Sequence, residues 1–250
     1  MKDMKLNRVT LTGADDTVKP GDLFDIFARY PFVEWGILLS RTRMGQPRYP
    51  STAWLMELSF ECERREIGIN LSVHLCGGLV REIVRGDDSA FHDFDVPLSL
   101  AHRIQLNFAG QHVDVDRHAF GQVLKRHARY QYVFQLEGRN EGLFDAALES
   151  LKLNAAGLFD CSGGRGVTPE TWPSPKWLAI DHSYAGGLGP DNIEAELPRI
   201  CAAHSASGSS SDFGVDMESK VRDEEDRFDL FRCEKVLERC APFVRQSQTL

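Results

Sequence analysis

The sequence predicts an α/β fold in which eight parallel strands close into a single barrel over residues 1–250, the (β/α)8 or TIM barrel. Three observations lead to this prediction. Apolar, β-branched runs alternate with helical patterns along the whole chain, which favours a parallel sheet. Eight such units fit into 250 residues, a usual length for a closed barrel. No long linker divides the chain, so we expect one domain.

The predicted strands are short apolar runs bounded by turn residues. In chain order they cover Val9–Gly13, Trp35–Ser40, Ile69–Cys76, Ile104–Phe108, Tyr132–Leu136, Gly157–Cys161, Ser183–Gly186 and Phe213–Met217. The predicted helices lie between them and carry apolar residues at helical spacing. They cover Asp22–Tyr30, Thr52–Arg64, Gly78–Arg85, Asp116–Arg129, Glu141–Leu151, Asn192–His204 and Glu225–Val244.

Two connections depart from this regular alternation. The segment Thr168–Lys176 holds three prolines and can carry only a short helix, if any, because proline removes a helix hydrogen bond. The segment Gly86–His102 has little periodicity and contains four aspartates, which favours an irregular, solvated acidic loop over a metal site. A doubly wound open sheet is the structural alternative to the barrel.

Composition excludes several classes of function. The formal charge is −8 and the basic residues are scattered, whereas a nucleic-acid partner requires a clustered positive face. No apolar run approaches the roughly 20 residues of a membrane span. The six cysteines form no CxxC pair and the eight histidines no ligand-like spacing, so we expect reduced thiols, no metal and no cofactor in a cytoplasmic protein.

Polar residues cluster at the predicted strand ends, where the active site of a parallel barrel lies. Side chains alternate along a strand, so polar residues two positions apart can face the lumen together. The candidates are Thr10, Thr12, Ser72, His74, Gln105, Asn107, Gln135, Glu137, Asp160 and Asp216. Buried polar groups are costly unless they are paired, so this convergence favours a ligand site over a purely structural interior.

The strongest local signal runs from His182 to Ile193, in the sequence HSYAGGLGPDNI. A strand that enters Gly186–Gly187 and then a helix exposes backbone N–H groups to an anion, and we expect Asp191 or Asn192 to cap that helix. Val215–Ser219 provides the counterpart after the last strand. Phosphate sites recur after strands seven and eight of such barrels, so we expect a small phosphorylated substrate here.

Three segments together resemble phosphoribosylanthranilate isomerase, a barrel enzyme of tryptophan biosynthesis. The segment Leu158-Phe-Asp160 with Gly163-Gly-Arg-Gly166 resembles the family's strand-six aspartate and glycine-rich loop. Ala185–Asn192 and Gly214–Ser219 are similar to its two phosphate loops, and Asp226–Asp229 lies where the family starts its last helix. Weaker similarities are Gln105-Leu-Asn107 and Gln46–Ser51, and strand order agrees over nearly the whole chain.

The resemblance implies an Amadori rearrangement, in which an N-linked ribose phosphate becomes an open-chain 1-amino-2-ketose. It places one catalytic residue at Asp160. It places the other, a cysteine in the family, at Thr12. It implies substrate contacts at Arg48 (near the anthranilate carboxylate), Asn107, Gly186, Gly187, Asp216 and Ser219, in a protein that is a monomer or a homodimer.

Thr12 departs from the family pattern, because a threonine hydroxyl is far too weakly acidic to ionise near neutral pH. Asp15, Asp16 or Cys76 could replace the missing base. Three hypotheses follow: a phosphosugar isomerase with Asp160 as acid, a diverged barrel enzyme that transfers protons on another phosphorylated metabolite by Glu137, His74 or Asp160, or a non-catalytic homologue that binds a phosphorylated ligand.

Overall fold

Eight parallel strands form a closed barrel, in the order β1 to β8, with β8 returning to pair with β1. The computed structural model describes residues 6–108, 115–136, 140–149, 151–161, 166–209 and 211–244. The strands are β1 (Leu6–Thr12), β2 (Val33–Leu39), β3 (Leu71–Cys76), β4 (Arg103–Asn107), β5 (Gln131–Gln135), β6 (Ala155–Asp160), β7 (His182–Ala185) and β8 (Phe213–Met217). The predicted barrel is confirmed, and the open sheet is wrong.

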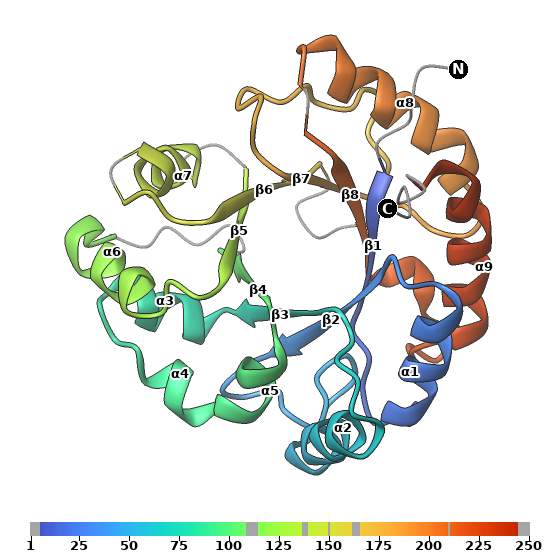
Figure 1. The fold of residues 1–250 in the computed structure, drawn as a ribbon, viewed down its shortest axis with the longest axis horizontal. Helices are drawn as coiled ribbons and strands as arrows, with labels where there is room; N and C mark the ends of the chain where they lie inside the picture. The colour runs from blue at the N-terminus through green and yellow to red at the C-terminus, as the bar shows by residue number, and fades with distance from the viewer. Residues whose placement is uncertain are drawn as a thin grey trace.

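Helices surround the strands on the outside of the barrel (Figure 1). They are α1 (Pro20–Arg29), α2 (Thr52–Arg65), α3 (Gly78–Val84), α4 (Ser89–Asp93), α5 (Asp95–Leu100), α6 (Arg117–Arg126), α7 (Asn140–Glu149), α8 (Ile193–Ala206) and α9 (Leu230–Cys240), with short 3-10 helices η1 (Ser219–Val221) and η2 (Ala241–Phe243). No helix of the described ranges is long and apolar enough to cross a membrane.

Two predicted segments differ from the structure. The stretch Gly86–His102 is not an irregular loop but forms α4 and α5, because Phe91 and Leu98 are buried in the core. The last helix begins at Leu230 rather than Glu225. Asp229 sets this start, since its carboxylate accepts hydrogen bonds from the amides of Phe231 and Arg232, which the helix leaves unpaired.

Two tryptophans anchor the connection between β6 and β7, where no helix forms within residues 166–181. Trp172 is buried, and its Nε1 donates to Glu196 Oε2 of α8 at 2.8 Å. Trp177 donates to Asp145 Oδ1 of α7 at 2.7 Å and packs edge-on against Phe144. These contacts attach the proline-rich segment to the helices on both sides, in place of a helix of its own.

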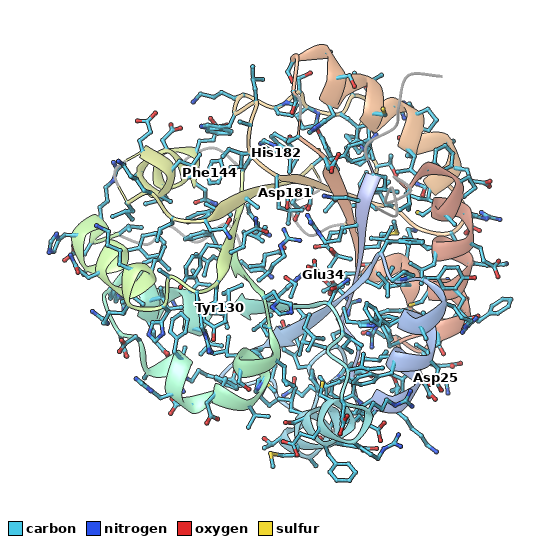
Figure 2. All side chains as sticks on the ribbon, in the orientation of Figure 1. Asp25, Glu34, Tyr130, Phe144, Asp181 and His182 are labelled. Atoms are coloured by element: carbon cyan, nitrogen blue, oxygen red, sulfur yellow. The ribbon has the colours of Figure 1, made fainter. Side chains whose placement is uncertain are left out.

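The amino-terminal part of the lumen holds a buried ionic network. Glu34 accepts hydrogen bonds from Thr10 (2.8 Å) and Arg103 (3.0 Å), and Arg8 lies 3.5 Å from it. Asp181 lies 3.1 Å from Arg8. Glu34 points toward the centre of the ring of strands, while Phe144 lies between the strands and the outer helices (Figure 2). These charged side chains fill the amino-terminal part of the lumen, and the cavity described below lies at the carboxyl ends of the strands.

Candidate active site

A cavity of about 480 Å³ opens at the carboxyl ends of the strands, and every strand or the loop after it contributes to its lining. Seven residues predicted from the sequence as site residues meet there: Thr12, Asn107, Asp160, Gly186, Gly187, Asp216 and Ser219. Gln105, Gln135 and His74 also line it. Thr10 and Ser72 are buried but do not line the cavity, and Glu137 lies outside the described residues.

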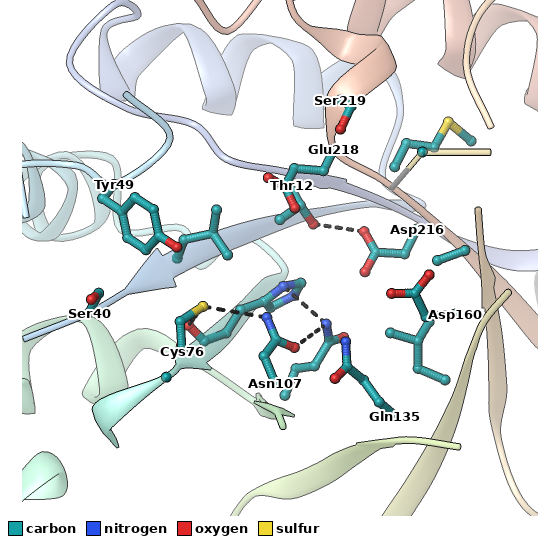
Figure 3. Close-up of a pocket in the computed structure, with 18 of the residues that line it drawn as sticks. Thr12, Ser40, Tyr49, Cys76, Asn107, Gln135, Asp160, Asp216, Glu218 and Ser219 are labelled. Atoms are coloured by element: carbon teal, nitrogen blue, oxygen red, sulfur yellow. Dashed lines mark hydrogen bonds between the residues drawn. The ribbon is translucent and has the colours of Figure 1, made fainter. Parts of the chain in front are cut away.

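Two carboxyl groups, those of Asp160 and Asp216, face the same part of the cavity (Figure 3). Asp160 pairs in register with Ala185 of β7, and Ala185 pairs with Asp216 of β8. The two aspartates therefore stand at one level of the barrel with a single small residue between them. Two strand spacings separate their backbones by roughly 10 Å along the sheet.

Asp216 is buried and bonded to Thr12, whose Oγ1 donates to its Oδ1 at 2.7 Å. Burial raises the pKa of Asp216 to about 7; the Thr12 hydrogen bond lowers it, while Glu218, Glu34 and Asp160 raise it further. A carboxyl group with a pKa near neutrality can both take and give a proton at physiological pH.

Gly36 of β2 makes room for the Thr12 side chain. A Cβ at this position would lie 2.2 Å from Thr12 Oγ1, far inside contact distance. Thr12 is only 2% exposed, so its hydroxyl is held against Gly36 on one side and Asp216 on the other. The strand-one position thus carries a fixed hydrogen-bond donor.

Amide side chains form the wall contributed by β4 and β5. Gln105 Nε2 lies 3.0 Å from Asn107 Oδ1 and 3.2 Å from His74 Nδ1, and Asn107 Nδ2 lies 3.4 Å from Cys76 Sγ. The Gln105 amide donates, so His74 Nδ1 accepts and the ring proton is on Nε2. Burial lowers the pKa of His74 to about 4. This wall is neutral and suited to hydroxyl groups.

The three residues considered as substitute bases occupy different places. Asp15 is buried and pairs with Arg222 at 2.7 Å, while Asp16 bonds to Ser51 at the start of α2; neither lines the cavity. Cys76 does line it, but burial raises the pKa of its thiol to about 11, so it stays protonated near neutral pH.

The glycine loop after β7 packs closely on the chain after β6. Gly187 has φ +58°, and a Cβ there would lie 2.5 Å from the Thr168 nitrogen, so both conformation and space require glycine. Asn192 occupies the predicted N-cap position of α8, but its side chain does not cap the helix. It accepts from the Gly189 amide and donates to the Gly187 carbonyl and Thr168, which fixes the loop.

The loops after β6, β7 and β8 converge at one edge of the cavity. A Cβ on Gly166 would lie 3.6 Å from Ser219 Cβ, and one on Gly189 would lie 2.4 Å from Lys220 Cβ. Within the described part of the chain, no group accepts a hydrogen bond from the amides of Gly186, Gly187 or Ser219. The basic side chain of Lys220 also lines the cavity, next to Ser219 in the chain.

Arg48 is not among the residues that line the cavity. Its guanidinium bonds to Glu218 at 2.6 Å and to Asp226 at 2.8 Å, so it supports Glu218, which does line the cavity. A substrate contact by Arg48 stays a prediction. Arg43 and Arg81 line the cavity instead, from the chain after β2 and β3. Sequence reasoning missed both, because neither is part of a recognisable motif.

The residues described contain no group of three or more His, Cys, Asp or Glu side chains that could hold a metal ion. The cavity lining offers the carboxyl groups of Asp160 and Asp216, hydrogen-bonding amides and the basic side chains of Arg43, Arg81 and Lys220. Together they suit proton transfer on an anionic, hydroxylated molecule.

Fold and cavity define a (β/α)8 barrel with a polar site at the carboxyl ends of its strands. One similar solved structure is TrpF from Jonesia denitrificans, with a TM-score of 0.55 and 14% identity over 94% of this chain and 97% of that one. Another is phosphoribosyl anthranilate isomerase from Thermus thermophilus, with a TM-score of 0.53 and 13% identity over 94% of this chain and 98% of that one. A truncated 3-deoxy-D-arabino-heptulosonate 7-phosphate synthase from Thermotoga maritima is also similar, with a TM-score of 0.51 and 9% identity over 95% of this chain and 86% of that one. No family model and no curated protein matches the chain. At these identities the likeness shows the fold.

Proposed function

We propose that this protein is an isomerase of a phosphorylated sugar, and that it converts an N-linked aldose phosphate into a 1-amino-2-ketose phosphate by an Amadori rearrangement. The observation that carries the proposal is the shared cavity: Asp160 lines it together with the glycine loop after β7 and with Ser219 after β8. The motif resemblance supports the same reaction, and the two isomerase structures share the fold.

The loops of Gly186–Gly187 and Ser219 would bind the phosphate. Barrel enzymes often bind phosphate with the loops after strands seven and eight and a short extra helix, and η1 begins at Ser219 in the corresponding place. Lys220 adds a positive charge. The amides of Gln105, Asn107 and Gln135 would contact the sugar hydroxyls, and a volume of about 480 Å³ is in the range of small-molecule sites.

Asp160 would act as the acid that opens the sugar ring, because it stands beside the phosphate loops with its carboxyl group in the cavity. The test is turnover of phosphoribosylanthranilate by the purified protein, measured as the loss of substrate fluorescence. Asp160→Asn should lower kcat by a factor of about 10² to 10⁴. Asp22→Asn, an exposed residue of α1 outside the cavity lining, is the matched control and should keep full activity.

Undiminished turnover by Asp160→Asn would contradict the assignment of the acid. Binding of phosphoribosylanthranilate without turnover by the unchanged protein would contradict the isomerase proposal. It would favour one of the other two hypotheses, proton transfer on a different phosphorylated metabolite or ligand binding without catalysis. Rescue of a tryptophan auxotroph by the gene, and failure of the Asp160→Asn gene to rescue, would support the proposed reaction in cells.

A further inference from the structure

We propose that Asp216 is the general base of this site and that Thr12 is a positioning residue that holds it. The inference rests on the proposed function and names the group that removes the proton from C2 of the sugar. It differs from the expectation drawn from the sequence, which placed a catalytic residue at Thr12 and a substrate contact at Asp216.

The geometry favours two carboxyl groups that work as a pair. Asp160 and Asp216 stand at one level of the barrel, in register with Ala185 between them, and both line the cavity. The side chain of Ala185 is small, and the carboxyl groups of Asp160 and Asp216 face the same part of the cavity (Figure 3). A ring opening followed by proton removal from the neighbouring carbon requires an acid and a base in such an arrangement.

Thr12 is oriented as a donor and not as a base. Its hydroxyl gives its hydrogen to Asp216 Oδ1 at 2.7 Å, which occupies one carboxyl oxygen and restrains the group. Gly36 lets the hydroxyl reach this position, since any Cβ there would overlap Thr12 Oγ1. This leaves the second oxygen of Asp216, a residue that lines the cavity, for a substrate.

The charges around Asp216 suit a base that works near neutral pH. Burial raises its pKa to about 7; the charged groups that face it and raise it further are Glu218 after β8, Glu34 from β2 and Asp160 from β6, while Thr12 lowers it. The neighbouring strand β7 presents uncharged Ala185 at this level. A base with a pKa near the working pH combines a large ionised fraction with strong proton affinity.

The other titratable groups of the cavity fit the role less well. The thiol of Cys76 is held protonated by burial, and the pKa of His74 is lowered to about 4, which makes it a weak base. Glu218 is engaged by Arg48 at 2.6 Å. Asp216 is thus the group that combines access to the cavity with a fixed orientation and a useful proton affinity.

The proposed step balances without an oxidant or a further reactant. Asp160 gives a proton to the ring oxygen as the C1–O bond breaks, which leaves a C1=N iminium ion. Asp216 takes the C2 proton, and the C–H electron pair forms the C1=C2 bond while the iminium electrons return to nitrogen. Asp216 then gives its proton to C1 while the enol hydroxyl proton passes to Asp160, which gives the ketose and restores both carboxyl groups.

The test compares the pH profile of kcat/KM for three variants with the unchanged protein. We expect activity to rise with pH through an apparent pKa near 7, and Asp216→Asn to lose a factor of about 10² to 10⁴. Thr12→Val removes a charge-assisted hydrogen bond, which should move the rising limb up by about 1 to 2 pH units. Thr12→Ser keeps the hydroxyl and should restore the original limb.

Thr17→Val is the matched control, because Thr17 also donates to a buried carboxylate, that of Asp15, and neither residue lines the cavity. This variant should not move the rising limb of the pH profile of kcat/KM. An unshifted limb in Thr12→Val, or full activity in Asp216→Asn, would overturn the inference. A ¹³C NMR titration of the aspartate carboxyls separates it from the proposed function: a pKa of Asp216 near 4 overturns the inference, whereas a value near 7 without turnover contradicts only the reaction.

Discussion

Asp216→Asn should stabilise the protein at alkaline pH, because it removes a carboxyl group that must ionise while buried. The pKa of Asp216 rises from its ordinary value of 3.8 to about 7, mainly through burial. A pKa increase of about 3, at roughly 1.36 kcal/mol per pKa unit, corresponds to a loss of about 4 kcal/mol in the free energy of unfolding once Asp216 is ionised. Since the folded-state pKa is raised, Asp216 does not lower the free energy of unfolding below pH 3.8, where it is protonated in both states. The loss of stability grows between pH 4 and 7 and is complete above about pH 7.

Urea unfolding of both proteins between pH 4 and 8.5 measures this difference. The asparagine keeps an oxygen that can accept from Thr12, but its buried NH₂ group adds a cost that does not depend on pH. The readout is therefore the change with pH: the variant should gain about 4 kcal/mol relative to the unchanged protein from pH 4 to pH 8, then level off. A difference independent of pH would refute a raised pKa at Asp216.

Two further substitutions test the architecture around the cavity. Gly187→Ala should weaken phosphate binding at least tenfold and destabilise the fold by more than about 1 kcal/mol, because a Cβ at φ +58° would meet the Thr168 backbone at 2.5 Å. Gly68→Ala, with open space around it, is the control, and equal phosphate affinity in both variants would contradict phosphate binding by the Gly187 loop. Arg222→Met should lower the free energy of unfolding by about 3 to 5 kcal/mol, because it leaves Asp15 buried without its partner. The control Arg227→Met removes an exposed ion pair and should lower the free energy of unfolding by less than about 1 kcal/mol. Similar losses in both variants would contradict a stabilising role for the buried Arg222–Asp15 pair.

The barrel was predictable because its strands are buried on both faces and therefore stand out as apolar runs. The strand and helix bounds mostly agree within a few residues. The sequence did not predict α4 and α5, because their two short turns are held by a few buried residues such as Phe91 and Leu98 and not by a periodic face. Nor did it predict the start of α9, which depends on the Asp229 cap.

The candidate site was predictable in its positions more than in its roles. Strand ends converge in any parallel barrel, so Asp160, Asn107 and Asp216 could be placed together. What each group does depends on neighbours from distant segments. The bond from Thr12 to Asp216 joins residues 204 positions apart.

Arginines illustrate the same limit. Arg48 was expected to contact substrate, but the structure directs its guanidinium to Glu218 and Asp226, two carboxylates about 170 residues further along the chain. Arg43 lines the cavity although only five positions separate it from Arg48. Side-chain direction in a loop follows from such tertiary ion pairs, which no local pattern encodes.

The central claim is that the loops after β7 and β8 bind the phosphate group of the substrate with their backbone amides. A titration of ¹⁵N-labelled protein with inorganic phosphate, followed by amide NMR, tests it most directly. We predict that the Gly186, Gly187 and Ser219 amides shift together in one saturable process while the Gly68 amide does not move. Saturable shifts confined to another surface, or none at the three amides, would contradict the claim.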